Sequence, residues 1–121
     1  MVPKQTFLRA DNDLATSVYD FHERFRVPFL SSISTADDVT NTMSYRIRLQ
    51  CEELGELSSA VNKEEFEEIF GEAADVLYIA LGTILVSSGY GTNACKAVVQ
   101  KNVKKTKDTH RLSDSGKVIK L

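Results

Sequence analysis

Two acidic clusters lie within apolar, helix-patterned sequence between residues 47 and 81. The first cluster comprises Glu52, Glu53 and Glu56, and the second comprises Glu72 and Asp75. Residues three or four apart share one face of a helix, so each cluster directs its carboxylates to one side. If the two helices pack antiparallel, four or five carboxylates meet at one place.

Converging carboxylates need a compensating charge, because they repel one another and lose solvation when they are buried. A hard cation is the usual compensation for an all-oxygen cluster. Mg²⁺ prefers near-octahedral oxygen coordination and often shares its ligand shell with substrate phosphates. The two clusters therefore predict a Mg²⁺ site, with Mn²⁺ as a substitute ion.

The alternative interpretation of the first cluster is a solvated helix face, because Glu favours helices and is common on their surfaces. Glu72 and Asp75 are harder to explain in this way, since they open the most apolar stretch of the chain. The acidic run at residues 64–68 precedes that stretch and has no partner pattern, so it fits a solvated face.

Composition narrows the class of protein. The chain has 121 residues, of which 42% are hydrophobic and 26% are charged, and this predicts a single soluble domain over residues 1–121 with a polar C-terminal tail at 107–121. A formal net charge of −2 argues against a nucleic-acid partner. Positive charge predominates from Lys96 onward, which suits a metal–polyphosphate ligand and, equally, an intramolecular salt-bridge arrangement.

The cysteines and the termini bear on the compartment. Cys51 and Cys95 have no metal-binding spacing, so we expect reduced thiols and a cytoplasmic protein. The N-terminus lacks the apolar region of a signal peptide. The best candidate for a membrane span, residues 76–86, is too short, so we expect no membrane partner.

Hydrophobic periodicity predicts an all-α bundle of four to five helices, near residues 12–25, 42–61, 63–87 and 94–107. Residues 1–10 are expected to be extended, 26–41 to form a long connection with a short turn at 35–39, and 116–120 to form a short extended piece. The buried stripe of the second helix is assigned to Ile47, Leu54, Leu57 and Val61. The third helix is apolar on most sides, which favours an oligomer.

The acidic residues form the pattern Glu-Glu-x-x-Glu, fifteen intervening residues, then Glu-x-x-Asp. This pattern resembles the signature of the MazG-like all-α nucleoside triphosphate pyrophosphohydrolases, which are related to the phosphoribosyl-ATP pyrophosphatases. Segments resembling the phosphoribosyl-ATP-pyrophosphatase-like branch flank it at residues 20–28, 76–78, 102–105 and 114–118.

The resemblance implies a homodimer or homotetramer formed through the second and third helices. It implies hydrolysis of a nucleoside triphosphate between the α- and β-phosphates, which yields a nucleoside monophosphate and pyrophosphate. It also assigns the Mg²⁺ ligands to Glu53, Glu56, Glu72 and Asp75. Glu52 is then a further ligand or the general base, so Glu52 and Glu53 are the catalytic candidates.

The same resemblance assigns phosphate contacts to Asn102 and Lys105, together with Lys101 and Lys96. A base pocket is expected from the first helix, the loop after it and the partner chain. The candidates to line this pocket are Phe21, His22, Phe25 and Phe29, although core packing is the alternative for Phe21 and Phe25.

Three functions stay open. The first is Mg²⁺-dependent pyrophosphohydrolysis of deoxynucleotides or non-standard nucleotides, which would clean the nucleotide pool. The second is a phosphoribosyl-ATP pyrophosphatase of histidine synthesis. The third is a non-catalytic helical module that dimerises or binds a partner and whose acids are merely solvated. An effect of Mg²⁺ on stability separates the third from the other two.

Overall fold

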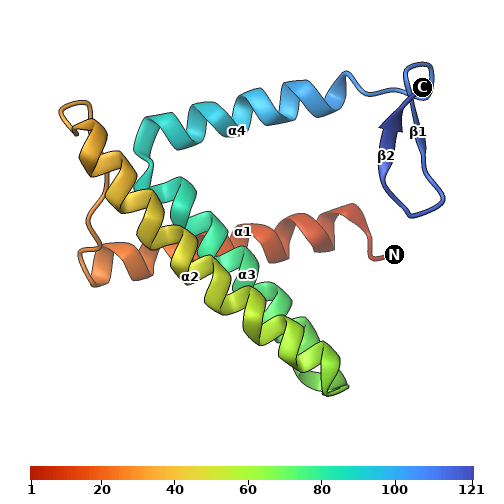
Figure 1. The fold of residues 1–121 in the computed structure, drawn as a ribbon, viewed down its shortest axis with the longest axis horizontal. Helices are drawn as coiled ribbons and strands as arrows, with labels where there is room; N and C mark the ends of the chain where they lie inside the picture. Colours follow the sequence, from red (N-terminus) through yellow and green to blue (C-terminus); the bar gives the residue numbers. More distant parts are fainter.

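The computed structural model describes all 121 residues as four helices followed by a small hairpin (Figure 1). The predicted all-α class is therefore confirmed. The elements are α1 (Lys4–Arg24), α2 (Ala36–Asn62), α3 (Phe66–Val86), α4 (Ser88–Val103), β1 (His110–Leu112) and β2 (Val118–Lys120).

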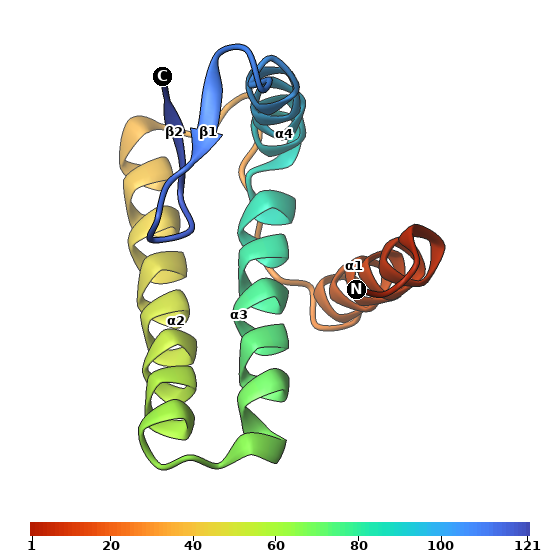
Figure 2. The same ribbon diagram turned by 90° about the vertical axis from the view of Figure 1, so that its right-hand side faces the viewer.

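Helix α3 is the centre of the fold. It lies antiparallel and side by side with α2, and a short turn joins the two helices (Figure 2). Helices α1 and α4 also pack on α3, but neither approaches α2 or the other, and the hairpin of β1 and β2 packs on no helix. The protomer is thus a helical hairpin with two arms.

The predicted helix boundaries need correction at both ends of the chain. Helix α1 begins directly after Pro3, so residues 4–10 are helical rather than extended; a proline is tolerated here because the first helical N–H groups have no intrahelical partner. Helix α4 begins at Ser88 rather than near Ala94, and it includes the Tyr90-Gly91 pair that was expected to form a turn. A Cβ on Gly91 would lie 2.3 Å from the carbonyl oxygen of Ile84, so this close junction requires glycine.

Helix α2 begins earlier than predicted because its first turn has a complete capping box. The Thr35 hydroxyl accepts a hydrogen bond from the Asp38 N–H (3.1 Å), and the Asp38 carboxylate accepts one from the Thr35 N–H (2.8 Å). The short turn expected at 35–39 is therefore the start of α2. The turn between α2 and α3 closes at Glu64, whose φ of 55° ends the helical path, so α3 begins at Phe66 rather than Lys63.

Thr35→Ala is expected to lower the free energy of unfolding by about 1 kcal/mol, because it removes the side-chain acceptor of the capping box. Urea unfolding followed by circular dichroism measures this change. Thr40→Ala, at an exposed position inside α2, is the matched control and should not destabilise the protein. Equal losses from both variants would contradict the assigned role of the cap.

The predicted buried stripe of α2 is wrong in its orientation. Ile47, Leu54 and Val61 are 61%, 48% and 50% exposed. Only Leu57 of the predicted set belongs to the more buried face, whose heptad-like spacing turns it toward α3. Polar side chains occupy much of this seam. The apolar stripe lies on a different face of α2, which is exposed to solvent in the single chain. The seam residues of α2 are Arg46, Gln50, Glu53, Leu57 and Ala60.

The protomer buries few apolar side chains. Only four hydrophobic residues are buried: Val18, Leu30, Ala60 and Val86. An 18-residue stretch of α3 has a mean hydropathy of 1.8, so the helix is long and apolar enough to cross a membrane, a property that the core helix of a soluble protein shares. The expectation that no apolar segment is long enough to span a membrane is therefore wrong. The apolar part of α3 includes residues that precede Val76, and the acids among them do not make it too polar to pass as a membrane span.

The extended piece predicted at residues 116–120 is confirmed as β2, which pairs antiparallel with β1. The tail therefore contains a hairpin, with Gly116 in its turn at a φ of 89°.

Candidate metal centre

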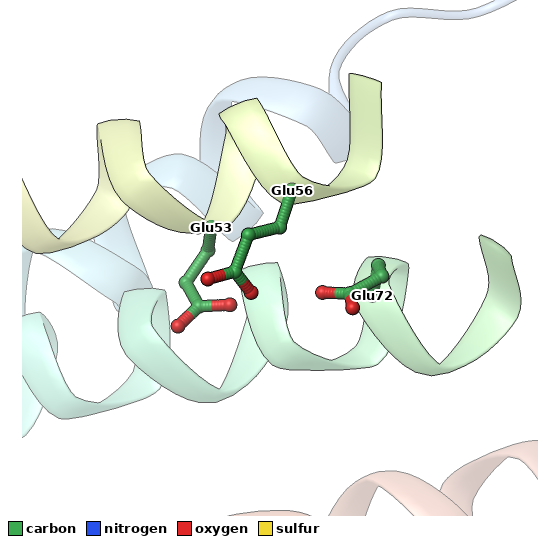
Figure 3. A group of neighbouring side chains, drawn as sticks. All are labelled: Glu53, Glu56 and Glu72. Carbon is green, nitrogen blue, oxygen red and sulfur yellow. The ribbon is translucent and has the colours of Figure 1, made fainter. Parts of the chain in front are cut away.

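Three glutamates converge in the seam between α2 and α3. Glu53 and Glu56 extend from α2 toward α3, and Glu72 extends from α3 toward them (Figure 3). One oxygen from each carboxylate lies within 4.8 Å of the others. The antiparallel packing expected from the sequence therefore brings the two acidic clusters together.

Two of these carboxylates have orphan oxygens. The Oε2 atoms of Glu53 and Glu72 are shielded from solvent and have no hydrogen-bond partner. Glu56 is exposed, so the cluster opens to solvent on that residue's side. A shielded carboxylate oxygen without a partner is unfavourable. A group that interacts with both oxygens would therefore stabilise the seam.

The electrostatics of the seam point in the same direction. Burial is the main cause that raises the pKa of Glu53, and the negative charges of Glu56, Asp75 and Glu52 raise it further. Burial likewise raises the pKa of Glu72, followed by the charges of Glu56, Asp75 and Glu53. The site holds more negative charge than its surroundings compensate.

Asp75 and Glu52 lie at the edge of this cluster. Asp75 follows Glu72 by one turn, is exposed, and contributes to the raised pKa values of both Glu53 and Glu72. Glu52 is exposed, and its charge raises the pKa of Glu53 less than the charges of Glu56 and Asp75 do. Neither belongs to the group of three whose oxygens converge.

The donor set fits a hard divalent cation. All three potential donors are carboxylate oxygens, which Mg²⁺ and Mn²⁺ prefer. Oxygens around one Mg²⁺ lie about 3 to 4 Å apart, because each bond is about 2.1 Å long. The present spacing of up to 4.8 Å therefore requires only small side-chain movements.

In metal-free solution Glu72→Gln is expected to raise the melting temperature, because it removes one of the repelling charges. The direction in which folding stability changes with pH follows from the raised pKa values of Glu53 and Glu72. The folded state holds these protons more tightly than the unfolded state, so wild-type stability should increase as pH falls through the raised pKa values. This gain should be smaller in Glu72→Gln.

Thermal unfolding in EDTA at several pH values measures both effects. Glu67→Gln, at an exposed position in the first turn of α3, is the control for loss of a surface charge. A melting temperature that falls in Glu72→Gln but not in Glu67→Gln would contradict a repulsive cluster.

The predicted phosphate-contacting residues lie on another part of the protomer. Lys96, Lys101 and Asn102 are on α4, and Lys105 follows its end. The Lys105 Nζ donates to the Asn102 Oδ1 (3.1 Å), so these two residues form a local pair. Helix α4 leaves the end of α3 and makes no contact with α2 (Figures 1 and 2). Within one protomer these side chains are separate from the glutamates.

His22 lines a cavity of about 510 Å³ between α1, the loop after it and the end of α3. Phe29 also lines this cavity. Phe21 and Phe25 are not part of its lining; their rings contact each other in a tilted arrangement with centroids 4.8 Å apart, and both side chains are exposed.

Sequence reasoning missed the polar residues that continue the seam beyond the acids. Gln50 donates to the carbonyl oxygen of Val76 (3.0 Å), and Arg46 is buried one turn closer to the N-terminus of α2. Their signal is the spacing of residues 46, 50 and 53, which places all three on one helical face.

The fold and the site define an all-α protein with a carboxylate cluster suited to a divalent metal. The family model of the phosphoribosyl-ATP pyrophosphohydrolases matches residues 18–102, which include both acidic clusters. The chain belongs to this family of pyrophosphohydrolases, in agreement with the resemblance seen in the sequence. Neither the curated proteins nor the solved structures contain a match to the chain.

Proposed function

We propose that the protein is a Mg²⁺-dependent nucleotide pyrophosphohydrolase that converts nucleoside or deoxynucleoside triphosphates to monophosphates and pyrophosphate. The observation that carries this proposal is the pair of shielded, unpartnered oxygens on Glu53 and Glu72. They lie within the segment that matches a pyrophosphohydrolase family. Removal of toxic or non-standard nucleotides from the pool is the role that we propose for this activity.

In this proposal Glu53, Glu56 and Glu72 hold the metal, and Asp75 completes its ligands from the edge of the cluster. When bound, Mg²⁺ supplies charge neutralisation at the phosphate oxygens and a lowered pKa for the attacking water. Glu52 is exposed beside Glu53 and would accept the proton of that water, or else serve as a further ligand.

We also propose that a second protomer completes the site. A leaving pyrophosphate needs cationic partners, and the lysines of α4 are separate from the glutamates of their own protomer. In the proposed homodimer or homotetramer, α4 of one protomer would approach the cluster of its partner. Asn102, Lys105, Lys101 and Lys96 would then contact the phosphates in trans.

An open apolar face supports this oligomer. Phe70 is 78% exposed, and Phe66 and Leu77 on α3 are exposed as well. On α3 the half-buried residues Ile69 and Val76 occupy seam positions, and Phe70 and Leu77 each follow one of them by one residue. Ile47 and Leu54 likewise follow the seam residues of α2 by one residue. In an antiparallel pair, equal offsets from the seam lie on the same side, so these residues form one face. Exposed apolar faces of this kind mark protein interfaces.

The family description keeps phosphoribosyl-ATP as the second candidate substrate. Pyrophosphate release from a panel of dNTPs, NTPs, dUTP, damaged nucleotides and phosphoribosyl-ATP distinguishes the two. We expect a dNTP or a non-standard nucleotide to have the highest kcat/KM. A higher value for phosphoribosyl-ATP, with rescue of a histidine auxotroph, would assign the protein to histidine synthesis. No release from folded, oligomeric protein would favour the non-catalytic module.

A further inference from the structure

Arg46 is a buried charge without an acidic partner. It is 6% exposed, and its side chain crosses from α2 to α3. Its Nε donates to the Thr83 Oγ1 (3.1 Å), and one terminal nitrogen donates to the carbonyl oxygen of Ile79 (2.8 Å). Burial lowers the pKa of Arg46, and the opposing effect comes from Tyr45 rather than from a carboxylate. Such a charge is costly to keep in a seam where an apolar residue would pack well.

The absence of a side chain at Gly82 leaves the space that the Arg46 side chain occupies. A Cβ at Gly82 would lie 2.4 Å from a terminal nitrogen of Arg46 and 3.0 Å from the His22 Nε2. Helices α1 and α2 do not contact each other, but here their side chains reach the same spot on α3. The missing side chain of Gly82 therefore forms a notch in which Arg46 approaches His22.

His22 faces the cavity of about 510 Å³ from one side of this notch. Burial is the main cause that lowers its pKa, and the positive charge of Arg46 lowers it further. From α1, Tyr19 and Glu23 line the same cavity, and the loop after α1 contributes the charged Arg26, whereas α3 adds no ionisable group to the lining. Arg46 is the charged group that reaches His22 from a neighbouring helix.

We propose that Arg46 is a positioning residue for His22: seated in the notch at Gly82, it keeps the imidazole neutral against the cavity, where the imidazole hydrogen-bonds the base of a nucleotide. This inference rests on the proposed function. A neutral imidazole offers one donor and one acceptor, and it loses the acceptor when protonated. The polar edge of a nucleobase likewise presents donors and acceptors.

The position of the notch suits a nucleotide whose phosphates lie at the glutamates. Arg46 precedes Glu53 by seven residues on the same face of α2, which corresponds to about 10 Å along the helix. The cavity walls include the aromatic side chains of Tyr19 and Phe29, which suit the flat face of a base. In this proposal the base lies beside His22 and the phosphates extend toward the acids.

NMR titration of the imidazole resonances tests the coupling directly. His22 and His110 are the only histidines, so His110, on β1, is an internal reference. Arg46→Met removes the charge, and Gly82→Ala displaces the guanidinium from the notch. Both variants should raise the titration midpoint of His22 without moving that of His110. Arg46→Lys should stay closer to the wild type, because it keeps the charge.

Arg48→Met is the matched control, since Arg48 is exposed on the same helix and lies over the Tyr45 ring. It should leave the His22 midpoint unchanged. Helical circular dichroism shows whether each variant is folded, and Arg46→Met decides the question if Gly82→Ala does not fold. An unchanged His22 midpoint in folded Arg46→Met would overturn the inference.

Steady-state kinetics test the consequence for the substrate. We compare the rise in KM for the preferred nucleotide when the pH is lowered from 8 to 6. This rise should be about three- to tenfold larger in Arg46→Met than in the wild type, because protonation of His22 in the variant removes one hydrogen bond to the base. The value of kcat should change less. Absence of pyrophosphate release from the wild type would overturn the proposed function. Active enzyme whose KM shows the same pH dependence in Arg46→Met and wild type would overturn this inference alone.

Discussion

Glu53→Gln is expected to slow pyrophosphate release by roughly 100- to 1,000-fold at saturating Mg²⁺ and nucleotide. Glu53 contributes one of the two shielded, unpartnered oxygens, and its carboxylate is close to those of both Glu56 and Glu72. Glutamine keeps the size of the side chain but removes the charge that would hold a divalent cation. The helical hairpin should fold, because the variant also relieves repulsion in the seam.

The same variant should lose the thermal stabilisation that Mg²⁺ gives the wild type. Glu67→Gln is the matched control for activity and for stabilisation, since it removes an exposed charge in the first turn of α3. The rate of pyrophosphate release and the melting temperature with and without Mg²⁺ are the two readouts. Retention of more than a tenth of the wild-type rate in Glu53→Gln would contradict the assigned role.

Phe70→Asp is expected to dissociate the oligomer and thereby to abolish activity. Phe70 is 78% exposed in the protomer and lies on the open apolar face of α2 and α3. Burial of one Phe side chain contributes about 1.5 to 3 kcal/mol. Each substitution counts twice in a two-fold symmetric interface. The dissociation constant should therefore rise by about 100-fold or more, and burial of the new carboxylate adds to this effect.

Light scattering coupled to size-exclusion chromatography measures the assembly. Ile33→Asp is the control, because Ile33 is an exposed apolar residue in the loop before α2 and lies outside this face. Ile33→Asp should keep the wild-type mass and activity. If Phe70→Asp also kept the wild-type mass, the face formed by α2 and α3 would not be the interface.

The helical class and the convergence of the acids were predictable, because both depend on local spacing. Glu53 and Glu56 share a face of any helix, and the many apolar residues of α3 favour a helix on which the other helices pack. The direction of burial on α2 was not predictable from hydrophobicity. Ile47, Leu54 and Val61 form a regular apolar stripe, but the seam with α3 is occupied by residues that carry charge or form hydrogen bonds. A periodic apolar stripe identifies a buried face without telling which neighbour buries it.

The predicted ends of the helices were wrong because the actual ends depend on local contacts. The start of α2 depends on the reciprocal hydrogen bonds of Thr35 and Asp38, and the sequence alone predicts only a short turn at this place. The start of α4 depends on the positive φ of Ser88 and the close approach at Gly91, neither of which has a strong sequence signal. The relation of Arg46 to His22 depends on three helices and could not be seen in one segment.

The measurement that tests the central claim most directly is identification of the first phosphate product by ³¹P NMR, with and without Mg²⁺, for wild type and Glu53→Gln. The metal-centre account predicts equal amounts of nucleoside monophosphate and pyrophosphate, formed by the wild type only when Mg²⁺ is present. It predicts little of either from Glu53→Gln. Orthophosphate as the first product, or pyrophosphate formed equally well without Mg²⁺ or without Glu53, would contradict it.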